Sequence, residues 1–135
     1  MRRATVLPIL LLVIAGCSDD SKSTTRDTTI EKPSAVVVVA EEHRFVPATV
    51  STRGVTEIRL DNVGALAHNW TVLARPIESE TELTGDIVLA RVETESGQSS
   101  TVGLDGLAAG TYQVVCSIPG HFSAGMVGTL VIRER

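Results

Sequence analysis

The chain has 135 residues, enough for one domain together with a leader or a tail. Hydrophobic residues make up 43% and charged residues 21%, but aromatic residues only 3%, so the core must be built from Val, Leu, Ile and Ala. The formal net charge of -4, together with the lack of any Lys/Arg-rich run, argues against nucleic acid as a partner.

The first segment, residues 1–16, has the features of a bacterial lipoprotein signal peptide. Two arginines precede an apolar stretch, Val6 to Ala15, which is too short to span a bilayer. Ile14-Ala15-Gly16-Cys17 resembles a lipobox, in which small residues precede the cysteine that becomes lipidated. The sequence therefore predicts lipidation of Cys17 and attachment to a membrane outside the cytoplasm, in the periplasm or at the cell surface. An ordinary signal peptide or an uncleaved anchor is the alternative interpretation.

The next segment, residues 18–34, is rich in Ser, Thr and Asp and contains a single apolar residue. A segment of this composition cannot bury enough apolar surface to order itself, so a flexible linker is predicted. The expected organisation is a signal peptide over residues 1–16, lipidated Cys17 with its linker over residues 17–34, and one domain over residues 35–135.

The residues after the linker have the pattern of short β-strands separated by turns. Val36 to Val39 is a β-branched run, and Val55 to Leu60 alternates between apolar and polar positions. Further strands are predicted at residues 69–74, 87–92, 100–104, 111–116 and 127–132. Seven or eight such strands predict an all-β sandwich of two sheets with Greek-key connections. Residues 75–86 fit either a loop or a short helical turn.

The most informative residues for function are Cys116, His121 and Met126, together with an upstream imidazole, His68. One cysteine, two histidines and a weakly held methionine form the ligand set of a blue-copper electron-transfer site. Soft sulfur favours Cu(I), whereas imidazole suits both oxidation states. The sequence therefore predicts one type 1 copper ion.

The expected strands explain how these residues could meet. Period-two alternation through residues 111–116 places Cys116 at the inward-facing end of a strand. Pro119-Gly120 then turns the chain, so that His121 and Met126 can return towards the sulfur. Because His68 begins another strand, all four side chains are expected at one end of the sandwich.

Three stretches of the chain resemble the cupredoxin family of type 1 blue copper proteins, especially its plastocyanin and azurin branches. They are Phe45-Val46-Pro47, Ala67-His68-Asn69-Trp70 and the run from Gly110 through Met126 to Val131. The resemblance covers approximately residues 35–135. It implies equatorial ligation by His68, Cys116 and His121 and axial ligation by Met126. It also implies that Asn69 braces the ligand loops and donates to the thiolate.

The resemblance further implies that electrons pass through the partly exposed ring of His121. The apolar residues beside the ligands would then form a docking patch, consisting of Gly64, Ala65, Leu66, Ile118 and Phe122. The expected partners are redox proteins such as c-type cytochromes or membrane oxidoreductases. Four protein ligands leave no open coordination position, so neither enzymatic activity nor a small-molecule substrate is expected.

Two other functions fit the same residues. Copper trafficking or buffering is one, although the chain has only two methionines and trafficking sites are often rich in them. A structural or zinc-binding domain is the other, since zinc also takes Cys and His, although it rarely takes a thioether. Among residues outside the site, His43 is expected to be a solvated strand residue, while Trp70 and Tyr112 are expected in the core, Tyr112 as a corner residue bonded to backbone.

Overall fold

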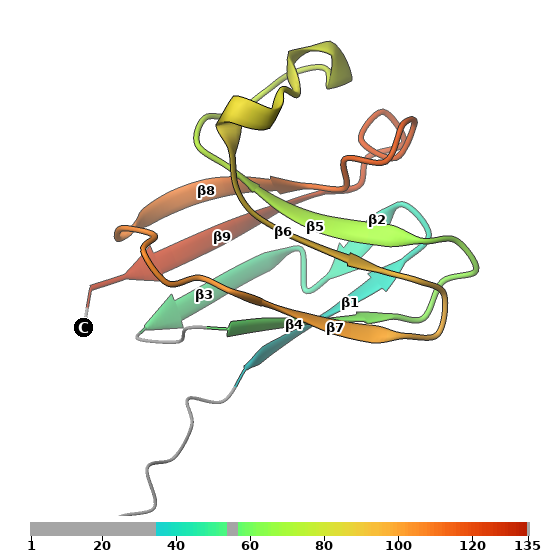
Figure 1. Ribbon diagram of the computed structural model, residues 1–135, viewed down its shortest axis with the longest axis horizontal. Helices are drawn as coiled ribbons and strands as arrows, with labels where there is room; N and C mark the ends of the chain where they lie inside the picture. The colour runs from blue at the N-terminus through green and yellow to red at the C-terminus, as the bar shows by residue number, and fades with distance from the viewer. Residues whose placement is uncertain (1–34, 54–56, 135) are drawn as a thin grey trace, which may run out of the picture. The chain divides into compact units, whose positions relative to one another are not determined.

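Two β-sheets pack face to face in the computed structural model, which describes residues 35–53 and 57–134 (Figure 1). The described residues form nine strands: β1 Val36–Glu41, β2 Arg44–Val46, β3 Thr49–Arg53, β4 Glu57–Asn62, β5 His68–Leu73, β6 Val88–Thr94, β7 Ser99–Gly103, β8 Gly110–Val115 and β9 Val127–Arg133. One sheet has the order β2-β1-β4-β7 and the other β3-β9-β8-β5-β6. The predicted all-β sandwich is confirmed.

The hydrophobic pattern of the sequence does not predict two of the strands, β2 and β3. The first has only three residues, Arg44–Val46. In the second, Val50 and Thr52 face inward, so one of its two buried positions carries a hydroxyl and the apolar alternation is incomplete. It pairs in parallel with β9, from Thr49 opposite Thr129 to Arg53 opposite Arg133. Its pairing partner, rather than its own hydrophobic pattern, makes this segment a strand.

The core between the sheets consists mainly of aliphatic side chains, as the composition requires. Val38, Ile58, Leu60, Val72, Val114 and Leu130 are completely buried. Each such side chain contributes about 1.5–3 kcal/mol relative to an exposed one. Trp70 is 2% exposed within this core, and the half-buried Tyr112 donates a 2.8 Å hydrogen bond to the carbonyl oxygen of Ala108. The prediction for Trp70 is confirmed, and so is the backbone hydrogen bond of Tyr112, but Tyr112 packs against the core and is only partly buried.

Three strand ends meet at one end of the sandwich, here called the ligand pole. β5 begins at His68, β8 ends directly before Cys116, and β9 begins directly after Met126. These strands are neighbours, since Val115 of β8 lies opposite both Thr71 of β5 and Val127 of β9. The turn between β1 and β2 lies at the same end (Figure 1).

The segment between β5 and β6 contains two short 3-10 turns, η1 (Glu80–Glu82) and η2 (Gly85–Ile87), which resolves the choice between loop and helical turn. It covers a second small core of Leu73, Ile77, Ile87 and Val115. The predicted signal peptide, Cys17 and the linker lie outside the described residues, as do Val55 and Thr56 of one expected strand. Within the described ranges, no helix has the length and hydropathy needed to cross a membrane.

Candidate metal centre

The structure brings His68, Cys116 and His121 together at the ligand pole. Their potential ligand atoms all lie within 4.8 Å of one another. The Nδ1 atoms of the two histidines are 3.2 Å apart, and Sγ of Cys116 is 3.4 Å from Nδ1 of His121. His68 and Cys116 are completely buried, and His121 is 7% exposed. A soft sulfur and two imidazole nitrogens that converge on buried residues fit a copper ion.

Met126 belongs to the same part of the core. It is completely buried and lies in the hydrophobic cluster that contains Cys116. Its carbonyl oxygen accepts a 3.0 Å hydrogen bond from the Cys116 amide, and its own amide donates a 3.0 Å bond to the carbonyl of His121. The backbone therefore closes the loop from Cys116 to Met126 on itself and holds the two sulfur-bearing residues at its base.

Further turns make this loop compact. The His121 amide donates to the carbonyl of Ile118 at 3.0 Å, and the Gly125 amide donates to Phe122 at 2.8 Å. Gly120 and Gly125 have φ values of 87° and 99°, a left-handed conformation that costs little only for glycine. The turn signal seen at Pro119-Gly120 in the sequence thus corresponds to the bend that brings His121 back to the sulfur.

Asn69 connects the start of β5 to the ligand loop. Its Oδ1 accepts hydrogen bonds from the Ser117 amide at 2.7 Å, the Ser117 hydroxyl at 3.1 Å and the Thr71 hydroxyl at 3.0 Å. The group that donates to Sγ of Cys116 is the Asn69 backbone amide, at 3.4 Å. Among the described residues, its side-chain Nδ2 has no hydrogen-bond partner. The side chain therefore joins two loops, while the main chain contacts the sulfur.

Burial keeps the three convergent groups neutral in the metal-free protein. Desolvation lowers the pKa of His68, and the nearby His121 lowers it further. Desolvation also lowers the pKa of His121, with a second contribution from His43. Burial raises the pKa of the Cys116 thiol, although the Asn69 amide opposes this effect. Cys116 would therefore have to lose its proton in order to hold a copper ion as a thiolate.

Copper affinity should accordingly rise with pH. The raised pKa of Cys116 keeps the thiol protonated in the free protein, so each bound Cu(II) releases one proton. We expect the apparent association constant to increase about tenfold per pH unit above the histidine pKa values and below that of the thiol. Competition titrations between pH 7 and 8.5, with buffer proton release measured by calorimetry, check this slope. An affinity independent of pH would contradict thiolate ligation.

The residues of the predicted docking patch differ in exposure. Ala65 and Leu66 are exposed, Leu66 by 48%, whereas Ile118 and Phe122 are half-buried and Gly64 is buried. Ile118 packs against the main core and Phe122 against the second small core. Val63, which directly precedes Gly64 and is not among the predicted patch residues, is 65% exposed.

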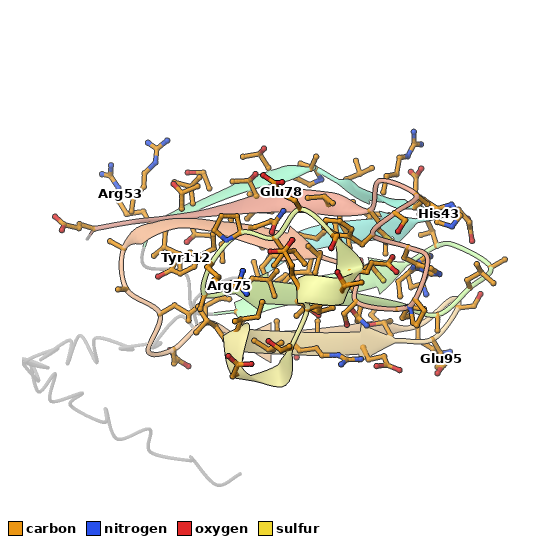
Figure 2. All side chains as sticks on the ribbon, turned by 90° about the horizontal axis from the view of Figure 1, so that it is seen from above. His43, Arg53, Arg75, Glu78, Glu95 and Tyr112 are labelled. Atoms are coloured by element: carbon orange, nitrogen blue, oxygen red, sulfur yellow. The ribbon has the colours of Figure 1, made fainter. Side chains whose placement is uncertain are left out.

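The expectation that His43 is a solvated strand residue is wrong. It is exposed, but it lies in the turn between β1 and β2 with φ 60° and contacts the ring of His121. The two ring centroids are 5.2 Å apart, with an edge-on interplanar angle of 78°. Figure 2 shows His43 at the opposite end of the sandwich from Arg53 and Tyr112. No local sequence signal indicates this contact, because it depends on how two distant turns meet.

Two carboxylates near the site were also missed. Glu42 accepts hydrogen bonds from backbone amides in the segment before His68, and Glu80 accepts them from amides beside His121. Both residues are charged and lie between strands, Glu42 in a turn and Glu80 in η1, so the sequence alone suggests only solvated positions.

Comparisons with known proteins agree with this geometry. Residues 33–133 match the family model of copper binding proteins of the plastocyanin/azurin family. The chain is 32% identical over 106 residues to the copper-resistant cuproprotein CopI of Rubrivivax gelatinosus, covering 72% of this chain and 64% of that protein. It is 27% identical over 109 residues to auracyanin-B of Chloroflexus aurantiacus, covering 65% of this chain and 46% of that protein. The chain thus spans less than two thirds of either relative.

Solved structures show the same fold. Auracyanin A, a "blue" copper protein from Chloroflexus aurantiacus, superimposes with a TM-score of 0.61 at 25% identity, over 75% of this chain and 99% of that one. Auracyanin from Roseiflexus castenholzii gives a TM-score of 0.63 at 20% identity, over 73% of this chain and 96% of that one, and supports the fold alone. The chain belongs to the plastocyanin/azurin family of copper-binding proteins, the cupredoxins, and its cofactor is copper in a type 1 site.

Proposed function

We propose that this protein carries single electrons between redox partners, with His68, Cys116 and His121 as equatorial copper ligands and Met126 as the axial ligand. One observation carries the proposal: the potential ligand atoms of these two histidines and the cysteine are buried and lie within 4.8 Å of one another. Copper, when bound, supplies the Cu(I)/Cu(II) couple. The protein is not proposed to be an enzyme, because four protein ligands leave no position for a substrate.

The surrounding residues supply what an electron carrier needs. Burial of His68 and Cys116 excludes water from the site. The Asn69 amide stabilises the negative charge on the sulfur, and the backbone bonds between Cys116 and Met126 fix the ligand loop. A site held in this way needs little rearrangement when its charge changes by one electron.

Electrons are proposed to leave through His121, which is the ligand nearest the surface at 7% exposure. The proposed docking patch consists of Ala65 and Leu66, which are exposed shortly before His68, and of the half-buried Ile118 and Phe122 in the loop that bears His121. The buried Gly64 directly precedes Ala65. An apolar surface of this kind suits transient association with a c-type cytochrome or a membrane oxidoreductase, since weak redox interfaces are small.

Replacing Leu66 by glutamate should slow electron transfer to such a partner. Leu66 is 48% exposed beside His68, so a charge there disturbs docking without reaching the core. We expect the second-order rate constant to fall several-fold while the visible spectrum stays close to that of the unmodified protein. The added charge should also lower the reduction potential slightly, so the potential of each variant is measured beside its rate. Leu89→Glu is the matched control, since Leu89 is 43% exposed near the start of β6, away from the ligand pole. Equal rate losses in both variants would argue against this docking surface. Stopped-flow mixing with cytochrome c measures the rates.

Anchoring at Cys17 in an extracytoplasmic membrane remains part of the proposal. The described domain begins at residue 35, and β1 then runs to the turn Glu41–Arg44 at the ligand pole. The residue at which the described domain begins therefore lies at the end of β1 away from the ligand pole. Incorporation of labelled palmitate, and its loss in Cys17→Ser, tests this attachment.

Copper trafficking or buffering is the second candidate, favoured by the similarity to the copper-resistant cuproprotein CopI. One experiment separates the two functions. The Cu(I)-loaded protein is mixed either with oxidised cytochrome c or with a Cu(I) chelator. Fast electron transfer with slow loss of copper supports the electron carrier, whereas rapid transfer of Cu(I) to the chelator without useful electron transfer supports trafficking.

A further inference from the structure

The loop that bears His121 is held by a carboxylate from a distant segment. Glu80, the first residue of η1, accepts hydrogen bonds from the Gly120 amide with both oxygens, at 3.0 and 3.2 Å. Its Oε1 also accepts a 3.1 Å bond from the Ser123 amide. These two amides lie on either side of His121 in the chain. Glu80 therefore holds the backbone before and after this histidine by hydrogen bonds.

The segment that carries Glu80 is itself held by hydrogen bonds. Oε1 of Glu82 accepts bonds from the amides of Glu78 and Ser79 at 2.9 and 3.1 Å, closing the start of η1. The side chain of Gln113 on β8 bonds both the amide and the carbonyl of Ile77, at 2.8 and 3.1 Å. These bonds fix the segment that carries Glu80 to β8, the strand that leads into Cys116. Glu80 therefore contacts the ligand loop from a segment that is itself held in place.

A second carboxylate does the same for the other histidine. Glu42, in the turn between β1 and β2, accepts hydrogen bonds from the amides of Ala65 and Leu66, the latter at 3.3 Å. These residues lead directly into His68. A Cβ atom on Gly64 would lie 2.6 Å from Oε1 of Glu42 and 3.0 Å from Nε2 of His68. The carboxylate and the histidine ring therefore both pack against one glycine, with no room for a side chain there.

Both carboxylates are charged at neutral pH. Hydrogen bonds from the backbone amides of Ser123 and Gly120 lower the pKa of Glu80, and the bond from Ala65 lowers the pKa of Glu42. A fixed negative charge near the metal stabilises Cu(II) relative to Cu(I), because Cu(II) carries one more positive charge.

We propose that Glu42 and Glu80 are positioning residues, one for each histidine, that fix the two ligand loops and lower the reduction potential of the copper. This inference rests on the proposed function, since it takes His68 and His121 as copper ligands. It assigns each carboxylate two separable effects, a mechanical effect through the backbone amides and an electrostatic effect through its charge.

Glutamine and alanine variants separate the two effects. Glutamine keeps an oxygen that can accept from the amides but removes the charge, whereas alanine removes both. The variants are Glu80→Gln, Glu80→Ala, Glu42→Gln and Glu42→Ala. Glu78→Gln is the matched control, because Glu78 is exposed on the segment before η1 (Figure 2). Its amide donates to Glu82, but its carboxylate has no hydrogen bond or ion pair to a described residue.

Three measurements are made on each variant: the reduction potential, the visible spectrum with copper affinity, and amide hydrogen exchange of the metal-free protein. We expect the glutamine variants to have a more positive potential with little change in the spectrum. The alanine variants should also bind copper about tenfold or more weakly and show a shifted band. In the metal-free protein, exchange should become faster at Gly120 and Ser123 in Glu80→Ala, and at Ala65 and Leu66 in Glu42→Ala.

The outcomes distinguish this inference from the proposed function. If the unmodified protein shows the blue or green copper band but the potentials of all glutamine variants equal that of Glu78→Gln, the electrostatic role is wrong. If amide exchange at the four named positions is unchanged in the alanine variants, the mechanical role is wrong. If the unmodified protein binds no copper, the proposed function fails, while the exchange data on the metal-free protein still test whether the carboxylates hold the loops.

Discussion

Cys116→Ser is expected to abolish both the visible copper band and redox cycling. The intense band of a type 1 site arises from charge transfer between the thiolate and Cu(II), and a hydroxyl at residue 116 cannot supply it. Because Cys116 is completely buried, the new hydroxyl also costs about 1–3 kcal/mol of folding stability if it finds no partner. Absorption spectroscopy, cyclic voltammetry and thermal unfolding of the purified variant measure the three effects.

Met126→Leu is the matched control for this variant, because it removes the other sulfur while keeping a buried apolar side chain of similar size. It should retain the thiolate band and shift the potential to a more positive value, since the axial ligand tunes the potential. A Cys116→Ser protein that still shows the intense band would disprove the thiolate assignment. A Met126→Leu protein without the band would show that the thioether is more than a weak axial ligand.

Asn69→Ala is expected to have the second-largest effect, on both stability and copper binding. The substitution removes the oxygen that accepts from the Ser117 amide, the Ser117 hydroxyl and the Thr71 hydroxyl. Thr71 is completely buried, so its unpaired hydroxyl should cost about 1–3 kcal/mol, whereas the half-buried Ser117 can partly bond to water instead; the total should be about 2–4 kcal/mol. Loosening the ligand loop should also weaken copper affinity by about 10–100-fold. Urea unfolding of the metal-free protein and competition titrations measure these quantities.

Tyr112→Phe provides the comparison for Asn69→Ala. It removes one hydrogen bond, from the Tyr112 hydroxyl to the Ala108 carbonyl, at the end of the sandwich opposite His43 (Figure 2). Stability should fall by about 0.5–1.5 kcal/mol with no change in copper affinity. Equal losses of copper affinity in the two variants would mean that Asn69 acts only through global stability, which would refute a specific bracing role.

The sequence determined the fold class and the composition of the site. Strands such as β5 and β8 could be predicted because their residues alternate or form apolar runs, and these patterns depend on neighbours along the chain. The grouping of Cys116, His121 and Met126 could be recognised for the same reason. All three lie in one loop, whose glycines and proline signal its turns.

The tertiary structure alone decided which distant segments surround the site. β3 could be identified as a strand only from its pairing with β9. His43 contacts His121 only because the β1–β2 turn lies at the ligand pole. In the same way, Glu42 and Glu80 have ordinary loop sequences, and their roles arise from the backbone amides that they meet across the fold. A periodic pattern records which face of a strand is buried. It does not record which turn of another strand will lie beside it, because that contact is set by sheet order and packing.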